Sequence, residues 1–502
     1  MSFWPSQHRG FHFDDAAHTT VVWWLLGAIV VLSIWWLYLT LPTPEFRGEA
    51  LLVIGFIGVW RYLWKALHLF RGLYYRYVRY PALSRLIDPS QKPTELLIVI
   101  PSYRTAPEIS TQVFNALVRE IDAFGVACRV VACVTDAADV NIIRSQWDAL
   151  RTRVPVTLHI IDQDGTGKRN ALADALELLA KDRPIAKDAV LVLMDGDSVV
   201  PEGIFSKVSG FFLRYHDLGA LTTHNASKVS GSSLKRQWYR QRMAQRHFFM
   251  NSLSLNYGLL TLTGRFSVFR ASLALSPEFI ESLRHDQVDH WRAGRIRFLT
   301  GDDKSTWFHV LKTRWKMMYL PDTVVTCLEE APEGSFVSSS LSLMTRWYGN
   351  MVRSNLRAIR LKPWHTGWFL WLCLLDQRIS VWTTLSGPFM ALFLTAVLGP
   401  QVLVAYLLWV VLTRSLHALL LWAQSGQFHP LFIPLLWYDQ MAGSLVKVYL
   451  LLKPERQRWT RQNIKAARSN DGLVLWFRNA LPKFEFTAAM SGLLVFVMLL
   501  YG

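Results

Sequence analysis

The stretch LVLMDGDSVV, residues 191–200, begins as a short apolar run and ends on two aspartates, Asp195 and Asp197, with Gly196 between them. Short apolar runs bounded by turn residues are typical of buried strands. Side chains at positions i and i+2 share one side only while the backbone stays extended. Two clustered carboxylates repel each other unless a cation lies between them, and Mg²⁺ or Mn²⁺ is the usual cation. We therefore predict a metal site on Asp195 and Asp197, with a solvated turn as the alternative, since Asp and Gly favour turns.

Three more short apolar runs precede this one, and helical stretches separate them. The runs cover 96–104, 129–135 and 156–162, and helices are expected at 109–122 and 169–181. Alternating strands and helices predict a mostly parallel sheet with both faces covered. In such sheets ligands bind beyond the carboxyl ends of the strands. We therefore expect a ligand site where the acidic strand ends gather, which are Asp136, Asp162, Asp164, Asp195 and Asp197.

The segment DGTGKRNAL (164–172) looks like a phosphate-binding loop. It fails the P-loop pattern of nucleoside triphosphatases, because Asp162 and Arg169 stand where that loop has Gly and Ser or Thr. Its glycines, together with Lys168 and Arg169 at a helix start, still suit an anion. A helix start with ordinary surface cations is the alternative. We take Asp164, Lys168 and Arg169 as candidates for binding the donor.

A third motif is FLTGDDKSTWF (298–308), in which Gly301 allows the chain to turn before Asp302 and Asp303. A carboxylate held close to an acceptor hydroxyl can take its proton as that oxygen attacks. Lys304 is placed to meet a phosphate. The alternative is that an aspartate caps the N-terminus of a helix here. We take Asp303, with Asp302 beside it, as the candidate general base.

The chain of 502 residues has a formal charge of +17 and is half hydrophobic, with the apolar residues clustered. The segment 21–42 does not fit a signal peptide, because it is too long and Asp14 and Asp15 precede it. The four cysteines form no metal-ligand pair, and a reducing cytoplasm leaves them free. An apolar run of about 20 residues spans a bilayer core of roughly 30 Å. The predicted spans of this integral membrane protein are 21–42, 50–70, 379–398, 401–423, 430–452 and 485–501.

These spans leave a polar middle, from about residue 90 to 345, as a globular insert. Arginine-rich stretches, 71–86 and 346–362, border it on both sides. Cytoplasmic flanks carry an excess of Lys and Arg, so the insert is expected in the cytoplasm.

The order of these motifs resembles the processive family-2 glycosyltransferases, the membrane synthases of cellulose, chitin and hyaluronan. The resemblance implies an α/β GT-A glycosyltransferase domain, inserted between transmembrane helices, and Mg²⁺ or Mn²⁺ as cofactor. It implies that Asp136 lies near the donor nucleoside, that Asp195 and Asp197 hold donor and metal, and that Asp303 is the base. Two further residues match the end of the Q-x-x-R-W motif, whose Gln position here is Leu343; they are Arg346 and Trp347.

Longer strings are similar to the catalytic subunits of bacterial alginate synthases, over about residues 50–502. They are GTGKR, LTTHNAS, LTGRFSVFRAS, HWRAGRIRFLTGDDKSTWF, RWYGN, DQRISVWTTL and RWTRQ. This resemblance implies transfer from GDP-mannuronate to a growing β-1,4-polymannuronate chain that crosses the bacterial inner membrane. It also implies partners: a PilZ-containing cyclic di-GMP-binding co-polymerase, and periplasmic and outer-membrane export proteins. A synthase of another β-linked polysaccharide is the nearest alternative, and an inactive transferase-like transport scaffold is a second one.

The remaining site assignments follow from the same reading. Lys304 and Arg346 join Lys168 around the donor, and Trp347, Arg265 and Arg270 are candidates for the acceptor. The excess of cations suits an acidic polymer and an anionic lipid surface, and we expect no nucleic-acid partner. Positive-inside topology is the plainer explanation for most of these cations. It explains the intramembrane Arg414 less well. The further candidates for a cationic lining are Arg292, Arg295, Arg297 and Arg414.

The expected organisation has five parts. They are an N-terminal cytoplasmic segment (1–20), two transmembrane helices (21–70), the cytoplasmic GT-A domain (90–345), interfacial helices (346–378) and a transmembrane channel region (379–502) containing a basic interfacial segment (453–482). Three crossings between 379 and 452 would place Arg456 outside, whereas the similar string of the synthases is cytoplasmic. Either one span is re-entrant, or the stretch 368–375 contributes to another crossing.

Overall fold

The computed structural model describes residues 44–103, 105–148, 155–163 and 167–457, with scattered positions between 476 and 495. The predicted first span, most of the last span, most of the basic segment 453–482 and the donor candidate Asp164 lie outside these residues.

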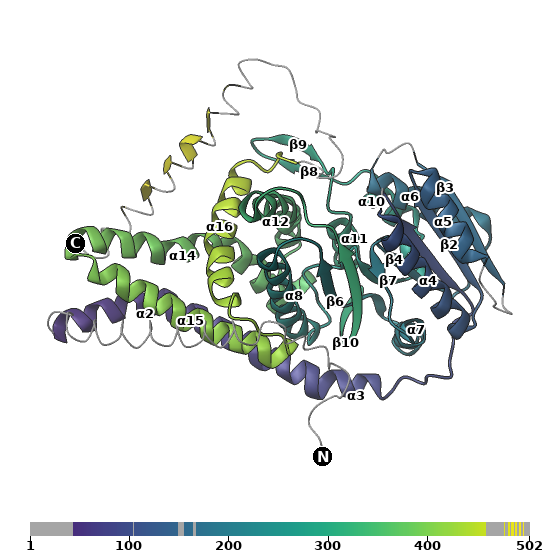
Figure 1. Ribbon diagram of the computed structural model, residues 1–502, viewed down its shortest axis with the longest axis horizontal. Coiled ribbons are helices and arrows are strands. Elements are labelled where there is room, and N and C mark those ends of the chain that lie inside the picture. Colours follow the sequence, from purple (N-terminus) through teal and green to yellow (C-terminus); the bar gives the residue numbers. More distant parts are fainter. Residues whose placement is uncertain are drawn as a thin grey trace.

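An eight-stranded sheet organises the middle of the chain (Figure 1), in the order β3-β2-β1-β4-β7-β6-β10-β5. Strand β1 pairs in parallel with β2 and β4, β2 with β3, and β6 with β10. Strand β7 is antiparallel to β4 and β6, and β5 is antiparallel to β10. The predicted mostly parallel sheet is therefore confirmed. Its strands are β1 Leu96–Pro101, β2 Cys128–Val134, β3 Val156–Asp162, β4 Val190–Met194, β5 Ser198–Val199, β6 Leu218–Val229, β7 Phe266–Arg270 and β10 Lys316–Glu329.

Apolar side chains of β1 alternate between two cores, one on each face of the sheet. Leu97 and Val99 pack with α6 and α11, while Ile98 and Ile100 pack with α4 and α7. Alternate strand positions point to opposite faces, so a strand apolar at every position needs both faces covered. The helices of this region are α4 Pro107–Phe124, α5 Ala137–Trp147, α6 Lys168–Asp182, α7 Ile204–Arg214, α8 Ser233–Ser254, α9 Ala271–Ala274, α10 Pro277–Arg284 and α11 Asp302–Lys312; a separate hairpin pairs β8 Gln287–His290 with β9 Gly294–Arg297.

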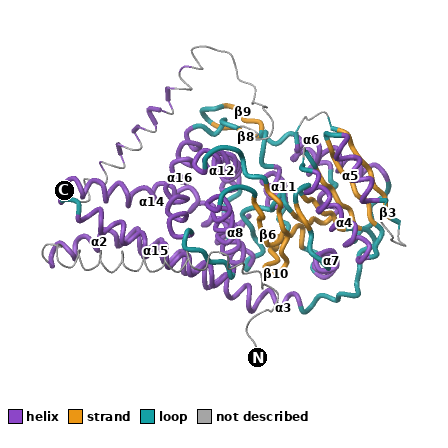
Figure 2. The backbone as a smooth tube through the Cα atoms, in the orientation of Figure 1, coloured by secondary structure: helices purple, strands orange, loops and turns teal. Residues whose placement is uncertain are grey.

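The rest of the described chain is helical and gathers at one end of the molecule, while the sheet occupies the other (Figure 2). Helix α8 packs against α2, α15 and α16 on one side and against β6 and β10 on the other. It therefore joins the two halves. The helices are α2 Pro44–Tyr74, the π-helix η1 Tyr75–Arg79, α3 Tyr80–Ser84, α12 Phe336–Arg360, α13 Pro363–Thr366, α14 Trp368–Leu398, α15 Gln401–Ser425 and α16 Phe432–Leu452.

Two of the described helices, α14 and α15, are long and apolar enough to cross a membrane. Helices α2 and α16 coincide with two more predicted spans, but charged side chains interrupt them. In α2, Arg61 pairs at 2.5 Å with Asp376 of α14, and in α16 Asp439 pairs with Arg242. The stretch 368–375 belongs to the same continuous helix as the predicted span 379–398.

Candidate active site

The D-G-D turn passes directly over the end of the neighbouring strand β1. The Gly196 amide donates to the Pro101 carbonyl at 3.2 Å, and the Leu328 amide donates to the Asp197 carbonyl at 2.8 Å. A Cβ on Gly196 would lie 3.1 Å from the Pro101 oxygen and from the side chain of Ser102. Glycine is needed here because the turn approaches β1 so closely, and the approach fixes both aspartates at the carboxyl edge of the sheet.

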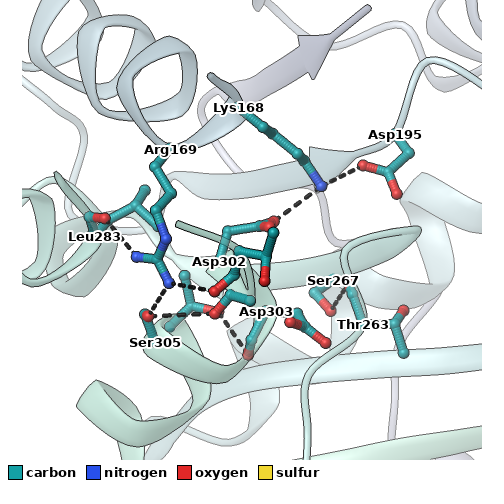
Figure 3. Close-up of polar contacts among 12 residues, drawn as sticks. Lys168, Arg169, Asp195, Thr263, Ser267, Leu283, Asp302, Asp303 and Ser305 are labelled. Carbon is teal, nitrogen blue, oxygen red and sulfur yellow. Dashed lines mark hydrogen bonds and ion pairs between the residues drawn. The ribbon is translucent and has the colours of Figure 1, made fainter. Parts of the chain in front are cut away.

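Lys168 joins two motifs that are far apart in the sequence. Its Nζ lies 2.6 Å from Asp195 Oδ1 and 2.8 Å from Asp302 Oδ2 (Figure 3). Burial alone would lower the pKa of Lys168, but the two carboxylates outweigh it and raise that pKa, so the ammonium stays charged. A Cβ on Gly264 would lie 3.0 Å from this Nζ, so a larger residue would press on the cluster.

The two aspartates of the G-D-D motif open helix α11, and their pKa values are shifted in opposite directions. Gly301 precedes them with φ 87°, as the predicted turn requires, and a Cβ there would lie 2.7 Å from Asn350 Cγ. Burial and the neighbouring charge of Asp302 raise the pKa of Asp303. Burial would also raise the pKa of Asp302, but Lys168 outweighs it and lowers that pKa. The ammonium of Lys168 therefore favours the ionised form of Asp302, whereas the surroundings of Asp303 favour its protonated form.

Of the two cations Lys304 and Arg169, only Lys304 reaches the cavity. Lys304 lines the same cavity as Asp303, donates to the Leu260 carbonyl, and has its pKa lowered to about 8 by burial, with Asp303 opposing. Arg169 is buried and does not line that cavity. Its guanidinium donates to the carbonyl of Leu283 at 2.7 Å and to the Ser305 hydroxyl at 2.7 Å. The donor role predicted for Arg169 is corrected to a structural one, because these acceptors occupy the cation and tie α6 to α10 and α11.

The two acceptor candidates lie at opposite ends of β7: Arg265 directly precedes the strand and Arg270 is its last residue. Arg265 lines the cavity and forms an ion pair with Glu329. Arg270 lies at the far edge of the sheet and is not among the residues that line the cavity. It donates to backbone carbonyls, which are those of Phe212 at 3.1 Å, Tyr215 at 3.0 Å and Leu218 at 3.2 Å. The prediction that Arg270 meets the acceptor is therefore wrong, because the strand carries it across the sheet.

The Arg-Trp pair of α12 forms another wall of the cavity. Trp347 stacks on Trp238 of α8, with ring centroids 5.8 Å apart, and the Arg242 guanidinium lies 4.7 Å from the Trp347 ring. Arg346 also lines the cavity. Leu343, at the usual Gln position, is only 3% exposed and packs in the same apolar cluster as Trp238. An apolar side chain suits this position because its neighbours are aromatic.

All these walls enclose one cavity of about 870 Å³. Ser102 and Thr135 lie among its lining at the strand ends, and Trp64 of α2 and Ser380 of α14 lie among it on the helical side. Asp136 does not line it, because its carboxylate caps α5 and accepts from the Ala138 amide at 2.9 Å. The structure thus brings together most of the described candidates: Lys168, Asp195, Asp197, Arg265, Asp302, Asp303, Lys304, Arg346 and Trp347.

The donor set of Asp195 and Asp197 suits a small divalent cation. Among the described residues there is no cluster of three or more His, Cys, Asp or Glu side chains that could hold a metal. Mg²⁺ is usually bound by one or two carboxylates, with substrate phosphates and water completing its shell. The two aspartates at the cavity wall match that requirement, so they fit a metal that arrives with a diphosphate.

Several cavity residues on α8 escaped the sequence reading. Tyr239, Arg242, Arg246 and Met250 recur at helical spacing and face the cavity. Their aromatic and cationic side chains at steps of three or four residues are a periodic signal that could have found them. Glu329, which holds Arg265, and Lys447 of α16 were also missed, because no local motif marks them.

Comparisons with known proteins agree with the motif order. Residues 93–350 match the family described as "Glycosyltransferase like family 2". The "Glycosyltransferase alg8" of Pseudomonas syringae pv. tomato is 35% identical over 443 residues, covering 87% of this chain and 90% of the relative. The "Glycosyltransferase alg8" of Azotobacter vinelandii is 35% identical over 465 residues, covering 91% and 94%.

Among solved structures, the mannosyltransferase PcManGT from Pyrobaculum calidifontis, in complex with GDP-Man and Mn²⁺, aligns with 78% of this chain and 99% of its own, at 17% identity and a TM-score of 0.47. The family match and the alg8 relatives stand independently of that alignment. This chain belongs to glycosyltransferase-like family 2 and is a relative of the alg8 glycosyltransferases, with a GT-A-like fold built on a mostly parallel sheet.

Proposed function

We propose that this glycosyltransferase is a processive, inverting enzyme that polymerises mannuronate from GDP-mannuronate into β-1,4-polymannuronate and passes the product across the bacterial inner membrane. The observation that carries the proposal is the bridge of Lys168 between Asp195 and Asp302. It joins the predicted donor motif to the predicted acceptor motif in one cavity. The resemblance to alginate synthase subunits supplies the choice of sugar, and the alg8 relatives support an alginate-type transferase.

The candidate residues that line the cavity have distinct roles in the proposed reaction. Asp195 and Asp197 would hold Mg²⁺ or Mn²⁺, which when bound neutralises charge on the leaving diphosphate. Lys168 and Arg346 add positive charge on the same side as the diphosphate departs. Asp303 takes the proton of the acceptor hydroxyl, whose oxygen forms the new bond to the anomeric carbon as the bond to the diphosphate breaks. In-line attack inverts the anomeric centre, and one base suffices because the acceptor is a sugar and not water.

The acceptor side of the cavity supports processive growth. Trp347 offers a flat apolar face on which a sugar ring can stack. The guanidinium of Arg242 lies close to the ring of Trp347. The lining continues to Trp64 of α2 and to Asp376 and Ser380 of α14. A chain elongated at Asp303 would therefore pass toward α14 and α15, the two described helices long and apolar enough to cross a membrane.

The partners belong to the same proposal. We propose a multi-pass protein of the inner membrane with its transferase domain in the cytoplasm. A separate PilZ-containing subunit would respond to cyclic di-GMP, and export proteins would receive the product. The arginine-rich flanks of the insert support this orientation.

The test uses the full chain in sealed membrane vesicles with GDP-mannuronate and Mg²⁺. We expect GDP release together with an acidic polymer that is protected inside the vesicles. Parallel reactions contain GDP-mannose, UDP-glucose or UDP-N-acetylglucosamine. Polymer from one of these donors alone would identify a different synthase. Release of neither GDP nor UDP from any donor would favour the inactive scaffold.

A further inference from the structure

Arg246 is a half-buried cation of the cavity wall with part of its hydrogen-bonding capacity unused. Its Nη1 donates to Asn225 Oδ1 at 2.8 Å. Its Nε and Nη2 are buried and have no hydrogen-bond partner among the residues that the structure describes. A buried polar group without a partner is destabilising, and more so when it is charged. Because Arg246 lines the cavity, the missing acceptor can be supplied by a molecule that enters it.

Arg246 lines the same cavity as Asp303 and lies within electrostatic range of it. Arg246 adds to the effect of burial in lowering the pKa of Lys304. Burial lowers the pKa of Arg246 itself to about 10, and Asp303 is among the groups that oppose this. Two cations therefore lie within electrostatic reach of Asp303.

Other cations of the cavity are already paired with carboxylates. Lys168 bridges two aspartates, Arg265 pairs with Glu329, and Arg242 pairs with Asp439 while donating to the Tyr348 hydroxyl at 2.9 Å. Arg246 instead donates to a neutral amide oxygen. It is therefore suited to an anion brought by the ligand.

The chemistry of a uronate acceptor calls for a cation at this place. In a 1,4-linked hexuronate, the attacking hydroxyl and the carboxylate are carried on adjacent ring carbons. When Asp303 accepts the hydroxyl proton, the sugar carboxylate must lie close to Asp303. Two carboxylates at short range repel each other unless a cation compensates them. A neutral hexose would bring no such charge.

We propose that Arg246 binds the carboxylate of the terminal acceptor sugar, assisted by Lys304, and so makes the acceptor site selective for uronates. This inference rests on the proposed function, because it assumes transfer to an acidic sugar. The planar guanidinium offers two parallel N–H groups to a carboxylate, which Lys cannot reproduce. Arg246 is thus a specificity-determining residue, separate from the groups that act on the donor.

The experiment measures binding of β-1,4-linked trimannuronate and of β-1,4-linked mannotriose to the full chain in nanodiscs, with GDP and Mg²⁺ present. The wild type is expected to bind the acidic trisaccharide at least about tenfold more tightly. Arg246→Gln should remove most of that preference and leave GDP affinity and mannotriose affinity within about twofold. Arg240→Gln is the matched control, because Arg240 is an exposed arginine of the same helix.

An unchanged preference in Arg246→Gln would overturn the inference. If that variant loses its thermal transition or its GDP affinity, Arg246→Lys decides, because it keeps the charge and loses the two-pronged geometry. We expect it to weaken the preference several-fold, and full retention would be the contrary result. Failure of the proposed function looks different: the wild type would make no polymer from GDP-mannuronate. Failure of this inference alone would leave that synthesis intact.

Discussion

The D-G-D turn and the G-D-D helix start contain the same residues, yet the structure gives them different chemistry. In the first, the Gly196 amide donates to the Pro101 carbonyl of β1 at 3.2 Å, and the aspartates lie on either side of this glycine. In the second, Gly301 takes a left-handed φ of 87° and both aspartates enter the first turn of a helix. Gly196 therefore allows the turn to lie close to β1, whereas Gly301 allows the left-handed backbone conformation before α11.

The difference explains how four nearby carboxylates avoid being equivalent. Asp195 shares Lys168 with Asp302, which holds Asp302 ionised. Asp303 instead accepts a hydrogen bond from the Thr261 hydroxyl at 3.4 Å, and its pKa is raised. Groups whose pKa values are pushed apart take different roles in catalysis. One cation shared between the two motifs thus shifts the pKa values of Asp302 and Asp303 in opposite directions, as the proposed division into a metal side and a base requires.

The largest effect on the difference between the two motifs is expected from Asp303→Asn, which removes the proposed base. Removing a general base costs about 10²–10⁴-fold in rate, so polymer synthesis and acceptor-dependent GDP release should fall by that factor. GDP affinity should stay unchanged, because Asp303 lies on the acceptor side. The control is Asp289→Asn in the exposed β8–β9 hairpin, where the aspartate pairs with Arg295. Full synthesis by Asp303→Asn would remove the base from the scheme.

The metal side of the contrast is tested by Asp197→Asn. Replacing a carboxylate ligand by an amide should raise the Mg²⁺ concentration required for half-maximal GDP binding by at least about tenfold, since even indirect supporting groups contribute that much. Binding of GDP at graded Mg²⁺ reports this without any turnover. An unaltered Mg²⁺ requirement would show that the metal is held elsewhere.

The shared cation can be removed with Lys168→Gln, which should change the pH dependence. Asp303 must be deprotonated to act, so kcat/KM rises as pH passes through its pKa. Lys168 lowers the pKa values of both Asp302 and Asp303. Without it both pKa values rise, and the acidic limb of the profile should move to higher pH. Lys181→Gln, on the exposed end of the same helix, should leave the limb in place.

Much of this arrangement could be predicted from short motifs. Apolar runs ending in acidic residues gave the parallel sheet and its ligand edge, because strand ends converge whatever the intervening helices do. The same logic failed for Arg270, the last residue of β7. Nothing in the local sequence says that β7 runs antiparallel to β4, and the reversed direction carries Arg270 away from the cavity.

Arg169 and Asp136 show a second limit. Both stand in motifs that suit a ligand, but the protein's own backbone takes up Arg169 through the Leu283 carbonyl and Asp136 through the Ala138 amide. Such partners come from tertiary packing or from a local cap that competes with the ligand. The cavity-facing residues of α8 were missed for the converse reason. Their spacing is visible in the sequence, but which face of α8 meets the cavity depends on α12 and the sheet.

The smallest expected effects sharpen the comparison of the two glycines. Gly301→Ala should lower the free energy of unfolding by about 1–2 kcal/mol through its left-handed backbone, with more from the contact that its Cβ makes with Asn350. Gly203→Ala is the matched control, because Gly203 has φ 74° and nothing within 4 Å of its Cβ position, so it reports the backbone cost alone.

Gly196 tests the other use of glycine. No positive φ is recorded for it, so alanine there meets only the 3.1 Å contacts with Pro101 and Ser102. In thermal unfolding in detergent, we expect Gly196→Ala to lose less stability than Gly301→Ala. The Mg²⁺ concentration required for GDP binding should shift only in Gly196→Ala. Equal losses of stability with no change in the Mg²⁺ requirement would mean that the two turns are interchangeable supports. The proposed division between a metal side and a base side would then lose its structural basis.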